Sequence, residues 1–184
     1  MTFAESYMQM KAYARIDGAL LGLLWVASFA CFIGNFAYPL LGFLWMAVIV
    51  ATPFFVGRRI CRFRDRVLDG NISFRRSFAY SVFNFFYAAL IFAIVQWMYF
   101  QFLDNGYFFS HYFATLKDPQ FKEMLRASGV TVSEAKEMLD AVSSLRPIDI
   151  AMQVLWMNIF AGAILSVFIG LFTMRNRPVI NSQE

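Results

Sequence analysis

Arginine is the residue type that points most directly to chemistry in this sequence. Seven arginines fall within residues 57–78, where only Asp65 and Asp69 carry negative charge. A guanidinium group donates two parallel hydrogen bonds to a phosphate or a carboxylate. The segment predicts either a topology signal attracted to anionic lipid by about 1 kcal/mol per side chain, or a specific site for a phosphate-bearing lipid or a protein partner. The residues concerned are Arg58, Arg59, Arg62, Arg64, Arg66, Arg75 and Arg76.

The other chemically capable residues form no recognisable catalytic or metal-binding set. The single histidine, His111, lies among aromatic residues, and the nearest acids, Asp104 and Asp118, complete no known motif. Asp17 is the ionisable residue inside an apolar run, and we expect it to stay hydrated at the membrane interface beside Arg15. We therefore predict no catalytic residue, no metal and no cofactor, in a protein that is not an enzyme.

Four long apolar runs must position the arginines. The chain of 184 residues is 60% hydrophobic and only 15% charged, whereas soluble domains carry roughly 25% charged residues. Most of the runs have about the length that a helix needs to cross roughly 30 Å of hydrocarbon. The sequence predicts an all-α fold, a polytopic four-helix transmembrane bundle in one membrane domain over residues 1–184. The expected spans are 16–34, 40–56, 78–103 and 148–173.

Two connecting segments are long enough to have structure of their own. In the basic segment 57–77, apolar residues recur at helical spacing, which indicates either a continuation of the second span or a separate interfacial helix. In the segment 104–147, Asp118-Pro119 and Thr131 to Glu134 are typical helix starts. We expect a two-helix insert there.

Lysine and arginine counts predict the orientation. The N-terminal segment, the basic segment and the C-terminal segment are rich in these residues, and the last contains Arg175 and Arg177. The segment 104–147 has five basic residues against six acidic ones. By the positive-inside rule, both termini and the loop 57–77 are expected to be cytoplasmic. The insert 104–147 is then extracytoplasmic.

Small residues recur at helix-packing spacing in two of the spans. Gly18 and Gly22 form a GxxxG pattern, and a second set recurs every four residues: Asn158, Gly162, Ser166 and Gly170. Small residues let membrane helices approach closely. These faces indicate packing within the chain or, alternatively, a homo-oligomer interface.

Several short motifs resemble a known family. They are Arg64-Asp65-Arg66, Gly70, Ile72-Ser73-Phe74 and Phe78, together with the insert segments 121–124 and 134–138. The chain is similar to a domain-of-unknown-function family of small four-span bacterial inner-membrane proteins with a basic loop between spans 2 and 3. The resemblance implies the bacterial inner (cytoplasmic) membrane but no activity. Members are often encoded beside a membrane-associated glycosyltransferase of the polyprenyl-phosphate sugar type, which implies an accessory role.

We therefore expect a non-catalytic accessory or anchoring subunit for a membrane-associated enzyme, such as a polyprenyl-phosphate glycosyltransferase. The expected partners are membrane lipids, anionic or polyprenyl-phosphate, an enzyme at the membrane and a second copy of the chain. Nucleic acid is not expected, because the basic cluster lies between apolar runs. The alternative is a small oligomeric transporter or lipid flippase, with a path lined by Gln96, Gln101, Gln153 and Asn158.

Overall fold

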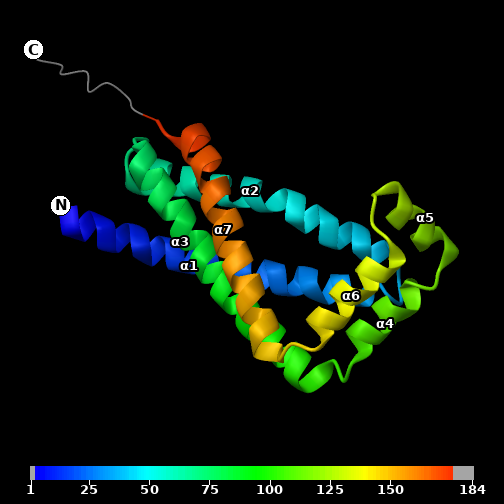
Figure 1. The fold of residues 1–184 in the computed structure, drawn as a ribbon. Coiled ribbons are helices and arrows are strands. Elements are labelled where there is room, and N and C mark those ends of the chain that lie inside the picture. Colours follow the sequence, from blue (N-terminus) through cyan, green and yellow to red (C-terminus); the bar gives the residue numbers. More distant parts are fainter. Residues whose placement is uncertain (1–2, 176–184) are drawn as a thin grey trace, which may run out of the picture. The chain divides into compact units, whose positions relative to one another are not determined.

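The computed structural model describes residues 3–175, with side chains from Tyr7 onward, and it is all-α in its regular elements. Arg177, which was counted for the orientation, lies outside the described residues. In chain order the helices are α1 (Phe3–Gly34), α2 (Leu40–Val67), α3 (Phe74–Met98), the π-helical turn η1 (Tyr99–Leu103), α4 (Tyr107–Thr115), α5 (Pro119–Ala127), α6 (Val132–Ser143) and α7 (Pro147–Thr173) (Figure 1).

Four helical segments are long and apolar enough to cross a membrane, which confirms the predicted number of spans. They are Tyr7–Gly34, Leu40–Val67, Phe74–Leu103 and Pro147–Thr173. The protein is accordingly a multi-pass membrane protein. Its spans begin and end close to the predicted boundaries, except where the basic segment and the N-terminal residues extend the helices.

The basic segment is mostly helical, so the expected loop 57–77 is much shorter than predicted. Of the two alternatives, the continuation of the second span is correct, because α2 runs on to Val67. Ile60 and Phe63 hold this extension, since both are buried in the core. The chain then turns through positive φ angles at Asp69 and Gly70, and α3 begins at residue 74 rather than 78.

The insert contains three short helices, so the prediction of two was wrong. The additional helix is α4, a segment for which no helix was predicted. Its start is fixed by Asp104, whose carboxylate accepts a hydrogen bond from the backbone N–H of Phe108 at 3.0 Å. Gly106, with φ of 80°, makes the turn that leads into the helix.

The starts of α5 and α6 agree with the predicted caps. The Asp118 carboxylate accepts the backbone N–H of Gln120 at 2.8 Å, with Pro119 in the first turn. Thr131 and Glu134 form a complete capping box, in which each side chain accepts a backbone N–H of the other residue. These local hydrogen bonds explain why short sequence motifs were sufficient to predict both helices.

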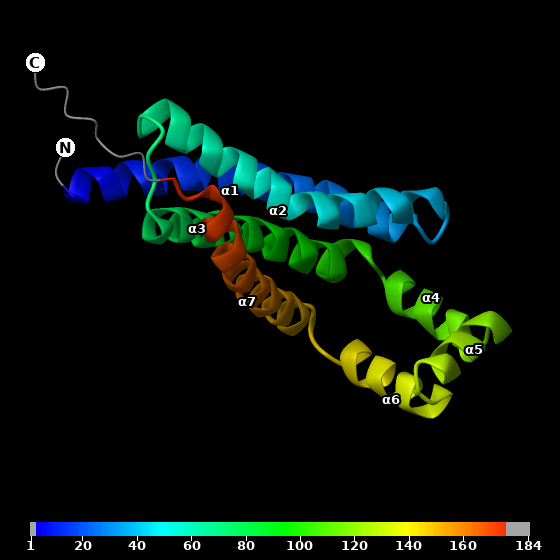
Figure 2. The ribbon, with the colours of Figure 1, turned by 90° about the horizontal axis from the view of Figure 1, so that it is seen from above.

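The chain divides into two compact units, which we call the core unit (Met1–Phe92 and Leu155–Glu184) and the insert unit (Ala93–Val154). In the core unit, α1 and α2 form an antiparallel hairpin beside α3 (Figure 2). Trp25 of α1 donates to the Thr52 hydroxyl of α2 at 3.1 Å. In the insert unit, α4 and α6 pack against each other.

Within the core unit, α3 has close neighbours on two sides. A Cβ atom added to Gly18 of α1 would lie 2.7 Å from the backbone oxygen of Asn84. A Cβ atom added to Gly162 of α7 would lie 2.6 Å from the Cβ atom of Phe85. Both helices therefore approach α3 so closely that only glycine fits at these two positions.

The other small residues of these faces lie at wider contacts. A Cβ atom at Gly22 or Gly170 would be 3.0 Å from a side-chain carbon of α3. The Ser166 hydroxyl is buried and donates to the Gly162 carbonyl within α7, while Asn158 is half-buried. Close helix packing within the chain accounts for these glycines, and a homo-oligomer interface stays a prediction.

Candidate functional site: the arginine end of the core unit

The seven arginines of the basic segment have different surroundings. Arg59 and Arg64 turn toward acidic groups of the protein. Arg76 is half-buried, with its guanidinium carbon 6.0 Å from the centre of the Phe63 ring. The remaining four are exposed and form no ion pair within the described part of the chain: Arg58, Arg62, Arg66 and Arg75.

Arg59 belongs to a buried polar cluster that joins three spans. Its Nε atom donates to Oδ1 of Asp17 at 2.6 Å, and its Nη2 atom donates to the same oxygen. The Tyr80 hydroxyl donates to Oδ2 of Asp17 at 2.5 Å. Asp17 is only 3% exposed and Tyr80 is fully buried. The cluster thus links α1, α2 and α3 through one carboxylate.

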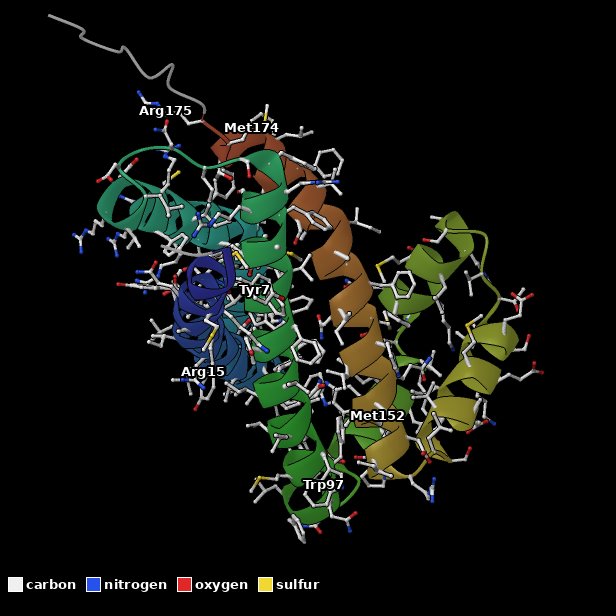
Figure 3. All side chains as sticks on the ribbon, turned by 90° about the vertical axis from the view of Figure 1, so that its left-hand side faces the viewer. Tyr7, Arg15, Trp97, Met152, Met174 and Arg175 are labelled. Atoms are coloured by element: carbon white, nitrogen blue, oxygen red, sulfur yellow. The ribbon has the colours of Figure 1, made fainter. Side chains whose placement is uncertain are left out.

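This cluster overturns the expectation that Asp17 stays hydrated beside Arg15. Arg15 is exposed on α1 (Figure 3), whereas Asp17 faces inward to Arg59. Burial of an unpaired carboxylate would be very unfavourable. The partners lie 42 and 63 positions along the chain, so no local motif reveals them. The available signal was an acid inside a span, which as a rule has a charged or polar partner.

A second set of contacts fixes the end of α7 near the basic segment. Arg64 donates from Nη1 to the carbonyl of Thr173 at 3.0 Å, and from Nε to Asp65 at 2.8 Å. The Ser77 and Thr173 hydroxyls form a buried hydrogen bond of 2.5 Å. A cation beside the last carbonyls of a helix is favourable because these groups lack intrahelical donors.

A short antiparallel backbone pair completes this attachment. The N–H of Ile72 donates to the carbonyl of Arg175 at 2.9 Å, and the N–H of Arg175 donates back at 3.0 Å. Arg175 follows Met174 at the end of α7 (Figure 3), and its side chain is exposed. The segment between α2 and α3 is therefore bonded to the chain that leaves α7.

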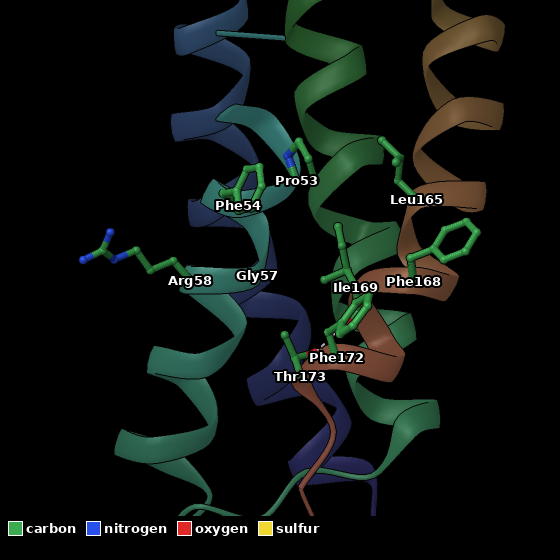
Figure 4. A pocket seen from close by; sticks show the side chains of 9 residues that line it. All are labelled: Pro53, Phe54, Gly57, Arg58, Leu165, Phe168, Ile169, Phe172 and Thr173. Carbon is green, nitrogen blue, oxygen red and sulfur yellow. Dashed lines mark hydrogen bonds between the residues drawn. The ribbon is translucent and has the colours of Figure 1, made fainter. Parts of the chain in front are cut away.

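An apolar groove lies between α2 and α7 at this end of the core unit (Figure 4). Its volume is about 520 Å³. Gly57 and Thr173 contribute small surfaces to the lining, and Arg58 lies at the rim. The six other lining residues are apolar: Pro53, Phe54, Leu165, Phe168, Ile169 and Phe172. The groove is thus an apolar hollow between two helices that are long and apolar enough to span a membrane, with a cation at its edge.

In α3, Oε1 of the buried Gln96 lacks a hydrogen-bond partner among the described residues, and so do two side chains in the core-unit part of the helix. They are Ser81, through its hydroxyl, and Asn84, through both atoms of its amide. Both side chains are fully buried. Buried polar groups are usually hydrogen-bonded, so these two differ from the nearby Tyr80, which bonds to Asp17.

The residues expected to line a transport path have mixed surroundings. In the insert unit, Gln96 is buried, whereas Gln101 and Gln153 are exposed. His111 is half-buried, and its ring centre lies 6.3 Å from that of Tyr107. Among the described residues, no group of three or more His, Cys, Asp or Glu side chains could hold a metal ion.

The four spans, the buried ion pair and the exposed arginines define an α-helical multi-pass membrane protein with a cationic end. The sequence model of a family described as "Protein of unknown function (DUF4199)" matches residues 17–175. The chain belongs to this family. Neither a curated protein nor a solved structure matches it.

Proposed function

We propose that this protein is a non-catalytic membrane subunit that holds a membrane-associated enzyme through its exposed arginines. One observation carries the proposal. Arg58, Arg62, Arg66 and Arg75 remain exposed and without an ion pair in the described residues, although acidic groups nearby engage Arg59 and Arg64.

The spacing of these arginines favours an external anionic partner. Arg58, Arg62 and Arg66 follow one another every four residues, so they form a stripe along one face of α2. Like charges at this spacing destabilise a helix by about 0.2–0.5 kcal/mol per pair. An acidic protein surface would remove this repulsion and would also be steered toward the stripe.

The partner class follows from the family resemblance and from the charge distribution. The proposed partner is an enzyme that works at the cytoplasmic face, such as one that acts on polyprenyl-phosphate-linked sugars. The positive-inside rule supports a cytoplasmic position for the arginine end. In this proposal the protein lies in the bacterial inner membrane with both termini in the cytoplasm.

The test is affinity purification from the native membrane in mild detergent, with mass spectrometry of the bound proteins. The wild-type protein is expected to retain an enzyme in stoichiometric amount. A variant with Arg62→Glu, Arg66→Glu and Arg75→Glu is expected to lose at least nine-tenths of it. The matched control makes the same change of charge at exposed residues of the insert unit, namely Lys117→Glu, Arg126→Glu and Lys136→Glu. The proposal fails if no enzyme is retained, or if both variants retain it equally.

A second candidate function is a small oligomeric transporter or lipid flippase, which the buried, unpartnered groups of Ser81 and Asn84 favour. Such groups can contact a polar solute that passes between helices. Reconstituted liposomes should then show flux that Asn84→Leu abolishes and Ser110→Leu, an exposed position, leaves unchanged. Absence of flux from the wild-type protein would remove this candidate.

A further inference from the structure

The apolar groove between α2 and α7 is a second candidate binding site, separate from the stripe of arginines proposed to bind an enzyme. We propose that this groove binds one anionic phospholipid, with an acyl chain between the two helices and the phosphate at Arg58. Both walls belong to membrane-spanning helices of the core unit. The occupant is therefore drawn from the surrounding bilayer.

The size and lining of the groove suit an acyl chain. Its volume of about 520 Å³ falls within the roughly 300–1,000 Å³ of ordinary ligand sites. Ile169 and Phe172 of α7 extend into the space opposite Pro53 and Phe54 of α2 (Figure 4). An apolar wall without neighbouring atoms forfeits dispersion contacts, and a hydrocarbon chain restores them. A second helix, about 10–12 Å across, would rest on the rim instead of filling the space.

Gly57 keeps the groove open. A Cβ atom added at Gly57 would meet only the Cγ2 atom of Thr173, at an ordinary contact distance of 3.9 Å. This differs from Gly18 and Gly162, where an added Cβ atom would clash at 2.7 and 2.6 Å. Helix packing thus accounts for those two glycines but not for Gly57. A larger side chain at Gly57 would extend into the groove without displacing the neighbouring helices.

The cation at the rim, Arg58, indicates the charge of the headgroup. The stem of Arg58 lines the groove, and its guanidinium group points away from the apolar walls (Figure 4). Arginines in spans often extend in this way to the headgroup level. Arg64 reaches the carbonyl of Thr173, the last residue of α7, and its charge is offset by Asp65. Arg58, the cation among the lining residues, has no ion pair in the described residues, so a phosphate is the complementary group.

The test measures lipid binding to the purified, delipidated full chain by native mass spectrometry. The probes are phosphatidylglycerol and phosphatidylcholine with identical acyl chains. The wild-type protein is expected to bind one phosphatidylglycerol most tightly, with at least a fivefold preference over phosphatidylcholine. Gly57→Leu is expected to weaken this binding at least tenfold, and Gly57→Ala by less. Arg58→Gln is expected to remove most of the headgroup preference.

Matched controls separate the groove from general effects on the helix. Ala51→Leu adds the same kind of side chain at an exposed position of α2 that does not line the groove. Arg66→Gln removes a charge elsewhere on the same helix. Both controls are expected to bind lipid like the wild type. Thermal unfolding of every variant in the same detergent tests whether its helices are folded like those of the wild-type protein.

The proposal is overturned if Gly57→Leu and wild-type protein bind phosphatidylglycerol equally well, or if the two lipids bind alike. It is also overturned if the species that Gly57→Leu abolishes is a dimer rather than a lipid complex. Failure of the protein-partner proposal is distinguishable from these outcomes, because enzyme capture depends there on Arg62, Arg66 and Arg75. A Gly57→Leu variant that loses lipid but still captures an enzyme would support both proposals.

Discussion

The core unit and the insert unit satisfy their polar groups in different ways. In the core unit, hydrogen bonds join side chains far apart in sequence, as between Asp17 and both Arg59 and Tyr80. In the insert unit, the caps at Asp118 and Thr131 join residues within three positions. A membrane interior offers no water to a polar side chain, so its partner must come from another span. Exposed helices can rely on water and on neighbours in the chain.

The largest effect that follows from this difference is expected for Asp17→Ala. The substitution removes the shared acceptor of Arg59 and Tyr80 and leaves a partly buried cation without its partner. We expect the free energy of unfolding to fall by about 2–4 kcal/mol, somewhat less than for a fully buried pair because the Arg59 side chain is 25% exposed. Unfolding by a denaturing detergent in mixed micelles measures the change.

The control for this prediction is Arg15→Ala, which lies two residues away on the exposed face of α1. It should change the free energy of unfolding by less than about 0.5 kcal/mol. A further comparison uses the double variant Asp17→Leu with Arg59→Met. Its free energy of unfolding should fall by less than the sum of the falls caused by Asp17→Leu alone and Arg59→Met alone, because no unpaired charge remains. Equal effects of Asp17→Ala and Arg15→Ala would contradict the role of the cluster.

A smaller effect within the core unit is expected for Gly162→Val. The added carbons would overlap Phe85, which lies 2.6 Å from the position of the new Cβ atom. Overpacking of this kind destabilises a protein by about 1–3 kcal/mol. The same unfolding measurement applies. Gly57→Ala serves as the control, since its new Cβ atom has room and alanine is the better helix former. If Gly57→Ala lowers the free energy of unfolding as much as Gly162→Val does, the close contact with α3 does not explain the glycine at position 162.

The smallest expected effect lies in the insert unit and depends on pH. Hydrogen bonds from the backbone N–H and the hydroxyl of Thr131 lower the pKa of Glu134 below its ordinary value of 4.5. The folded helix is therefore stabilised by the carboxylate form at pH values above 4.5, and this contribution is lost as the pH falls through the lower pKa of the folded state. Hydrogen exchange at the start of α6, corrected for intrinsic rates, should become faster over that range.

Glu134→Gln is the matched control for the capping box, because glutamine can make the same reciprocal bond without titrating. Its exchange at the start of α6 should not change with pH between 5 and the acid limit of the experiment. An identical acid response in wild-type and Glu134→Gln proteins would show that another group is responsible. The Asp17 cluster should be unaffected by Glu134→Gln, since the two sites belong to separate units.

The spans and the caps were predictable because their signals are local. Long apolar runs indicate membrane helices by length alone, and Thr131 with Glu134 specifies a helix start within four residues. The extent of α2 had two alternatives in the sequence, because arginines suit both an interfacial helix and an extended span. Burial of Ile60 and Phe63 decided that the helix continues. The aromatic residues of α4 carry no start signal other than the Asp104 side chain.

The sequence by itself determined an all-α protein with four spans, a cationic segment between the second and third of them, and two of the three insert helices. The tertiary structure alone decided which arginines are engaged internally and which remain exposed, and it alone placed Asp17 against Arg59 and Tyr80. The tertiary structure also forms the groove beside Gly57, between α2 and α7. The physical reason is that length, hydropathy and caps depend on neighbours in the chain, whereas ion pairs and grooves depend on how the faces of distant helices meet.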